Sequence, residues 1–255
     1  MFSLIFYCIS ACSDNVFHQN DAVKTTSNPL PRNGSLDDET LCQHYQIWKK
    51  SGISEPALQQ ALAYFKGHVG AFENRRVMSI ADYSKRSTQK RFFVFDWEDG
   101  SYTYNHVSHG SGKQNNIKHG DPNHDGMLDA CQYREDQTNM TRVGFFRTAE
   151  LYLSSQKWPA FSRNGRGKYS GMRMDGLSKT NKHARKKAVV MHEAYYNQHR
   201  IMGRSFGCPA FRPLEGRTII NRIREGSLFY AYVPQCSELY ATVLEQVPGW
   251  QSTCQ

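Results

Sequence analysis

Long apolar runs are missing from this chain of 255 residues. A transmembrane helix needs about 20 consecutive apolar residues, and no stretch of the sequence approaches that length. Internal repeats are missing as well, and so is the regular alternation of strands and helices that builds a parallel sheet. The composition is that of an ordinary globular protein, with 39% hydrophobic and 22% charged residues.

Acidic residues are comparatively scarce, because 23 Asp and Glu stand against 32 Lys and Arg, for a formal net charge of +9. A basic surface favours an anionic partner such as nucleic acid, membrane head groups or an acidic wall polymer, although charge also serves solubility. No RNA-binding or helix-turn-helix signature accompanies the charge. We therefore expect no nucleic-acid partner.

Residues 1–12 form a short apolar segment, MFSLIFYCISA followed by Cys12. An apolar run that ends in small residues is typical of a secretory signal. Ile9-Ser10-Ala11-Cys12 also resembles the lipobox of bacterial lipoproteins, in which the cysteine is lipidated. The run is short and no Lys or Arg precedes it, so an apolar N-terminal strand, or a true start further upstream, is the alternative. We expect export to the periplasm or cell envelope, with Cys12 as a candidate lipid anchor.

Residues 13–38 are rich in Ser, Asn, Asp, Thr and Pro and lack apolar periodicity, which predicts a flexible tether. Apolar residues then recur at helical spacing between about Glu39 and Gly67, which predicts two short helices. We expect this region, residues 39–76, to pack on a main domain of residues 77–235, with residues 236–255 as a C-terminal tail.

The main domain is dominated by strand patterns. Runs rich in aromatic and β-branched residues, separated by turn signals, predict strands. The expected strands are 77–83, 91–96 with 102–108 as a hairpin, 188–191 ending at His192, and 227–233, with a short helix at 218–225. We therefore expect an α+β fold built around a β-sandwich or barrel.

Cys208 stands between Gly207 and Pro209 in the segment GRSFGCPA. Glycine lets backbone or substrate approach closely, and proline fixes the direction in which the chain leaves. A structural cysteine more often sits among large apolar side chains. This setting makes Cys208 a candidate nucleophile, with a structural thiol as the alternative.

His192 lies sixteen positions before Cys208 (208 − 192) and follows an apolar strand. A free thiol has a pKa of about 8.5, and a neighbouring imidazole activates it by taking its proton. A structural histidine at a strand end is the alternative.

These residues resemble the L,D-transpeptidases, in which a histidine at a strand end is followed, after about fifteen residues, by Ser/Thr-His-Gly-Cys. Here Ser205-Phe206-Gly207-Cys208 follows His192. Phe206 in place of the second histidine, and Pro209-Ala210 after the cysteine, are similar to a divergent branch, the murein L,D-transpeptidase catalytic domain family. The resemblance covers roughly residues 77–233. It also includes Asp82-Tyr83-Ser84-Lys85, His109-Gly110-Ser111-Gly112, 144–150, 174–177, and Arg185 with the strand before His192.

The resemblance implies cysteine-dependent acyl transfer on peptidoglycan stem peptides by a protein that needs no cofactor and acts as a monomer. It implies that Cys208 forms a thioester with His192 as its base, and that the main-chain carbonyl of Glu193 orients the histidine ring. Backbone N–H groups of Gly207 and Cys208 are the expected oxyanion hole. The candidates for substrate binding are Arg204, Ser205, Phe206, His109 and Tyr195.

Other functions remain open at this point. An L,D-carboxypeptidase uses the same two residues with water as the acceptor. An inactive wall-binding lipoprotein is an alternative from another class, although it gives no reason to keep both Cys208 and His192. A papain-like endopeptidase has its cysteine before its histidine, which is the opposite of the order found here.

The segment DPNHDGMLD resembles the beginning of an EF-hand calcium loop. Oxygen ligands at positions 1, 3, 5 and 9 are Asp121, Asn123, Asp125 and Asp129, and Gly126 stands at position 6. Position 12 is Gln132 rather than the bidentate Glu, so we expect at most a weak structural calcium site. A polar turn is the alternative.

The chain has seven cysteines. If Cys8 leaves with the signal, Cys12 is lipidated and Cys208 is catalytic, four remain, and four cysteines can pair in three ways. An exported protein can form such disulfides. A bridge between Cys236 and Cys254 that closes the C-terminal tail is one candidate, and four free thiols are the alternative.

Overall fold

The computed structural model describes residues 36–112, 126–128, 131, 139–152, 171–194, 197, 202 and 205–255. Several residues predicted from the sequence therefore lie outside the described residues: Cys12, Asp121, Asn123, Asp125, Asp129, Tyr195 and Arg204. Among the helices of the described ranges, none has the length and apolar character to cross a membrane.

Two helices open the described chain, α1 (Asp38–Trp48) and α2 (Glu55–His68). They are the two helices predicted between Glu39 and Gly67. The Asp37 side chain caps α1 by accepting the Thr40 N–H at 2.7 Å. Pro56 lies in the first turn of α2, where a missing N–H costs no hydrogen bond. Short 3-10 turns follow the two helices at Lys49–Ser51 and Val69–Ala71.

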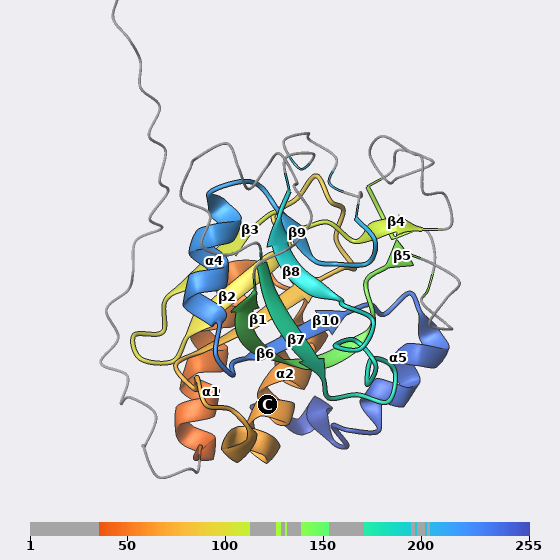
Figure 1. Ribbon diagram of the computed structural model, residues 1–255. Coiled ribbons are helices and arrows are strands. Elements are labelled where there is room, and N and C mark those ends of the chain that lie inside the picture. The colour runs from red at the N-terminus through yellow and green to blue at the C-terminus, as the bar shows by residue number, and fades with distance from the viewer. Residues whose placement is uncertain are drawn as a thin grey trace, which may run out of the picture.

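Within the described ranges, eight strands form one mixed sheet. In spatial order they are β3 (Tyr102–Asn105), β2 (Phe92–Asp96), β1 (Val77–Asp82), β10 (Leu228–Tyr232), β6 (Gly144–Tyr152), β7 (Gly171–Gly176), β8 (Val190–Glu193) and β9 (Ala210–Phe211). β1 runs parallel to β10 and β8 parallel to β9, while the other neighbours are antiparallel. A small second sheet pairs β4 (Gly110–Gly112) with β5 (Asn139–Met140). With α4 (Glu215–Ile223) and α5 (Ser237–Leu244), this is the expected α+β fold (Figure 1).

The main sheet curls into a half-barrel, so that strands near its two edges approach each other. Phe92 of β2 meets Phe211 of β9 edge to face, with ring centroids 4.8 Å apart. The chain just beyond β3 also reaches β9, because Ser108 donates its N–H to the carbonyl of Ala210 at 3.0 Å. The curl therefore brings the segment after β3 against the strand that follows Cys208.

Aromatic side chains are buried on both faces of the sheet. On one face Phe146 of β6 packs against Phe229 of β10. On the other face Phe145 stacks on Tyr64 of α2, with centroids 3.8 Å apart, since successive strand residues point to opposite sides. Every residue of β1 is buried, which is why this strand lacks the polar alternation of a half-exposed one.

The expected hairpin at residues 91–108 is present as β2 and β3, but β8 differs from its prediction. It begins at Val190 rather than Ala188 and runs through His192 to Glu193. Ala188 has a φ of +53°, in the left-handed region, and the Val189 N–H donates to Ala184 at 2.9 Å, so the chain is still turning there. The helix expected at 218–225 starts earlier, at Glu215.

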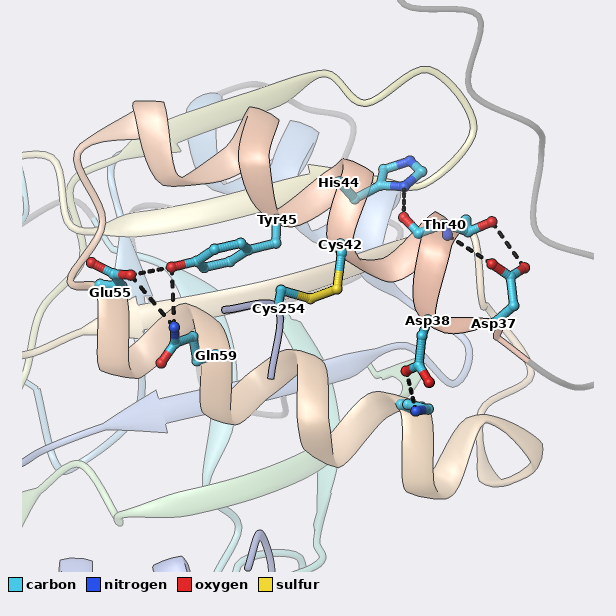
Figure 2. Close-up of a disulfide and its surroundings, with 10 residues drawn as sticks. Asp37, Asp38, Thr40, Cys42, His44, Tyr45, Glu55, Gln59 and Cys254 are labelled. Atoms are coloured by element: carbon cyan, nitrogen blue, oxygen red, sulfur yellow. Dashed lines mark hydrogen bonds and ion pairs between the residues drawn. A yellow bond between two sulfur atoms is a disulfide. The ribbon is translucent and has the colours of Figure 1, made fainter. Parts of the chain in front are cut away.

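The C-terminal tail is held by two disulfides, Cys42–Cys254 and Cys131–Cys236. The Cys236–Cys254 bridge suggested by the sequence is therefore wrong. Cys236 stands directly before α5 and Cys254 lies beyond the 3-10 turn Trp250–Ser252. Figure 2 shows Cys254 reaching α1 instead, beside a part-buried network in which Tyr45 donates to Glu55 and Gln59 donates to Tyr45.

Candidate active site

The turn that carries Cys208 is fixed by close backbone contacts. Gly207 has a φ of +91°, and a Cβ at this position would lie 2.7 Å from the carbonyl oxygen of Met140. Only glycine fits without displacing that backbone. Behind the turn, the Ser108 hydroxyl donates to the Cys208 carbonyl at 3.3 Å and accepts the Ala210 N–H at 3.0 Å. The main chain of Cys208 is thus held from both sides.

The thiol of Cys208 lies beside the start of β8. The Val190 N–H donates to its Sγ at 3.4 Å, and Sγ lies 4.0 Å from the Ala188 carbonyl oxygen. Burial raises the pKa of the thiol to about 11, against smaller lowering contributions from the Val190 N–H and the charge of Arg142. The resting thiol is therefore protonated at neutral pH, and its use as a nucleophile requires a base.

His192 lies next to this turn. Its N–H donates to the Pro209 carbonyl at 3.2 Å, and the residue pairs with Ala210 in the parallel register of β8 and β9. Its ring Nδ1 is 2.8 Å from the main-chain oxygen of Glu193. Because a carbonyl oxygen only accepts hydrogen bonds, Nδ1 carries the proton, and Nε2 is left as the ring's acceptor.

Burial lowers the pKa of His192, while the carbonyl and the charge of Glu193 oppose that shift. The ring is therefore neutral at pH 7 and able to take a proton. Within the part of the chain that the structure describes, no hydrogen bond joins the ring to Sγ of Cys208. Catalytic contacts are often looser in a site without substrate than in the reacting complex.

The remaining described candidates differ in their surroundings. The Phe206 side chain is 62% exposed beside Cys208, whereas Ser205 is only 2% exposed. His109 is completely buried, and its Nδ1 lies 2.7 Å from Nη2 of Arg91. Because Arg91 only donates, His109 accepts at Nδ1. The His109 side chain therefore contacts the buried Arg91 rather than the surface.

Two residues near Cys208 were not found by reading the sequence. Arg142 lies between β5 and β6 and is 6% exposed, and its charge lowers the pKa of the thiol. Tyr152 is the last residue of β6, and its ring packs against the backbone of Gly171. A Cβ at Gly171 would lie 2.9 Å from Cε1 of Tyr152 and 3.2 Å from Cβ of His192. Burial raises the pKa of Tyr152 to about 12, with a further contribution from Cys208. Neither belongs to a recognisable motif: Arg142 lies in the connection between β5 and β6, and Tyr152 reaches the site through its pairing with Gly171 of β7.

We predict that iodoacetamide alkylates Cys208 slowly at pH 7 and faster as the pH rises toward about 11. A thiol with a pKa near 11 has about 100-fold less thiolate at pH 7 than one with a pKa near 9. Mass spectrometry of the alkylated peptide against pH measures this midpoint. His192→Ala is expected to leave it unchanged, because no hydrogen bond joins the two side chains in the described structure. A midpoint below pH 8 that His192→Ala abolishes would instead reveal a resting thiolate–imidazolium pair.

Comparison with known proteins gives the family. The model of the L,D-transpeptidase catalytic domain matches residues 49–232, a range that includes α2, His192 and Cys208. The chain belongs to the L,D-transpeptidase catalytic domain family.

Among solved structures, the LD transpeptidase LdtMt1 in complex with imipenem is similar with 12% sequence identity and a TM-score of 0.36. The match covers 62% of this chain and 59% of that chain, so the chain spans less than two thirds of that structure's length. No curated protein matches.

Proposed function

We propose that this protein is an L,D-transpeptidase, a cysteine-dependent acyltransferase that acts on peptidoglycan stem peptides. Family membership supports the reaction class. The observation that carries the proposal for this chain is the His192 ring, whose Nδ1 is held by the Glu193 carbonyl at 2.8 Å so that Nε2 is free to accept, beside the rigid turn of Cys208.

In the proposed first half-reaction, Nε2 of His192 takes the thiol proton and Sγ of Cys208 attacks the carbonyl carbon before the terminal D-Ala of a donor stem. The N–H groups of Gly207 and Cys208 face the developing oxyanion, and one such donor is worth about 3 kcal/mol of barrier. The C–N bond then breaks, and the imidazolium gives its proton to the leaving D-Ala amine. A thioester on Cys208 remains.

In the second half-reaction, the side-chain amine of another stem attacks the thioester carbonyl and gives a proton to His192. The C–S bond breaks, the new amide cross-links the two stems, and the proton returns to the thiol. Water in place of the amine gives an L,D-carboxypeptidase. The exposed Phe206 offers an apolar surface beside Cys208 for either substrate.

The acceptor is tested by incubating the purified protein with a tetrapeptide muropeptide and separating the products by chromatography. A cross-linked dimer supports transpeptidation, and tripeptide alone makes the protein a carboxypeptidase. A carbapenem provides a second readout by intact mass. Absence of both products and of a carbapenem adduct on Cys208 would favour the inactive wall-binding lipoprotein.

We also propose that the protein is exported to the periplasm or cell envelope. The two disulfides support this, because disulfides persist mainly in oxidising compartments. Cys12 is the proposed lipid anchor. Labelling with a palmitate analogue is expected in the natural chain and not in Cys12→Ala, and recovery of the protein in the cytoplasm with reduced cysteines would refute export.

A weak structural calcium site remains a proposal for residues 121–129. Gly126 has a φ of +80° and Leu128 is 8% exposed, which suits the turn glycine and the apolar position of such a loop. Titration calorimetry with Ca²⁺ and the Tm measured with and without Ca²⁺ test this proposal. The absence of both binding heat and a rise in Tm would refute it.

A further inference from the structure

The side chain of Glu193 is clamped on the side of β8 away from the His192 ring. Glu193 is 4% exposed. Its Oε1 accepts the Leu214 N–H at 2.6 Å, and its Oε2 lies 3.3 Å from Nη2 of Arg217. Leu214 stands at the N-terminus of α4, where backbone N–H groups have no partner within the helix and favour a negative charge.

Close packing reinforces this clamp. A Cβ at Gly216 would lie 2.9 Å from Cγ of Glu193 and 2.8 Å from Cβ of Phe211, so α4 approaches β8 and β9 as closely as a glycine allows. Leu214 has a φ of +71°, in the left-handed region, a conformation that costs a non-glycine residue free energy. The bond from its N–H to Glu193 helps to offset that cost.

The main chain of the same residue faces the candidate base. The Glu193 carbonyl accepts from Nδ1 of His192, and successive side chains of a strand point to opposite faces. The Ala194 N–H donates to Phe211 at 2.9 Å, which fixes the next peptide on β9. The carboxylate on α4 and the carbonyl on the histidine ring belong to one residue, so the side-chain contacts oppose a backbone rotation of Glu193 that would turn this carbonyl away from the ring.

We propose that Glu193 is a positioning residue for His192. Its carboxylate is bound by the Leu214 N–H and Arg217. These contacts fix the Glu193 carbonyl on Nδ1 of His192 and place a buried negative charge near the ring. This rests on the proposed role of His192 as the base. The charge favours the imidazolium that forms when His192 takes the thiol proton, as the aspartate of a Ser-His-Asp triad does through direct contact. In agreement, the charge of Glu193 raises the pKa of His192 against the effect of burial.

The Glu193→Gln variant removes the negative charge of the side chain and keeps its size and shape. Its amide oxygen still accepts the Leu214 N–H, but the charge is lost. We expect kcat to fall with little change in KM, and the acid limb of the pH profile to move to lower pH by about one unit, which is a tenfold change in the proton equilibrium. Glu193→Ala also loses the clamp and is expected to lose more activity. A merely structural role of Glu193 predicts no shift of the pH profile.

Glu215→Gln is the matched control. Glu215 is an exposed carboxylate in the first turn of α4, the helix whose N-terminus binds Glu193, and its Oε1 lies 3.9 Å from Nη1 of Arg212. It is expected to keep the wild-type kcat and pH profile. A folded Glu193→Gln variant with both wild-type kcat and wild-type acid limb overturns the proposal, as does an equal shift in Glu215→Gln.

The pKa of His192, measured by NMR titration of its ring protons in the free protein, tests the proposal without turnover. A lower pKa in Glu193→Gln than in wild type supports the role of the charge even if no muropeptide is consumed, in which case only the proposed function fails. An unchanged pKa overturns the role of the charge even in an active enzyme.

Discussion

Replacing Cys208 with alanine is expected to abolish turnover and leave the fold intact. The thiol is the proposed nucleophile, and removing the nucleophile of a hydrolase costs on the order of 10⁶ in kcat. Its sulfur makes only two polar contacts in the described structure, with Val190 and Ala188, while the turn is held by main-chain contacts of Gly207 and by Ser108. Chromatography of muropeptide products measures the loss.

Cys208→Ser is the companion variant, since it keeps a nucleophilic atom of smaller size on the same turn. The free energy of unfolding of both variants is expected to lie within about 1 kcal/mol of the wild-type value, as is usual for substitutions that create no large packing defect. Persistent turnover by a folded Cys208→Ala variant would end the proposed mechanism. Loss of activity together with a large fall in Tm would contradict the view that Cys208 serves chemistry rather than packing.

Removing the Cys42–Cys254 disulfide is expected to give the largest loss of stability. Its cysteines are 212 residues apart in sequence, so the bridge strongly restricts the unfolded chain, and the chain-entropy estimate for so long a loop is about 5 kcal/mol. The Cys42→Ser, Cys254→Ser double variant changes both partners, so that neither is left as an unpaired thiol. Urea unfolding measures its free energy of unfolding against that of the wild type.

The Cys131→Ser, Cys236→Ser double variant is the internal comparison. This bridge has a sequence separation of 105, about half as long, and each halving of a loop changes its closure term by about 0.6 kcal/mol. The Cys42–Cys254 variant is therefore expected to be the less stable of the two by about that amount. Equal unfolding curves for wild type and the Cys42–Cys254 variant would show that the bridge adds no stability.

Local patterns predicted the elements whose signals lie within a few residues. The two N-terminal helices, the hairpin of β2 and β3 and the strand before Cys208 follow from spacing, turn residues and β-branched runs. The candidate nucleophile was recognisable because glycine and proline mark its turn in the sequence itself. His192, sixteen positions before Cys208, supplied a candidate base from the sequence. The family resemblance then supplied a substrate class.

Contacts between distant segments could not be read in this way. Arg142 comes close to the site from the connection between β5 and β6, and Tyr152 through its pairing with β7. Neither has a local signal that sets it apart from other Arg and Tyr residues. The left-handed φ of Ala188 delays the start of β8, yet alanine gives no warning of it. The disulfide pairing depends on where the tail runs after α5, which four cysteine positions do not determine.

The contact between Ser108 and Ala210 has a consequence for when the candidate site is assembled during folding. The two residues are about a hundred positions apart, and contacts of such separation form slowly because loop closure must precede them. The chain around Cys208 reaches its final conformation only when both ends of the curled sheet have met. A partly folded polypeptide therefore carries an ordinary thiol, and the alkylation midpoint of Cys208 is expected to rise to about pH 11 only when the fold is complete.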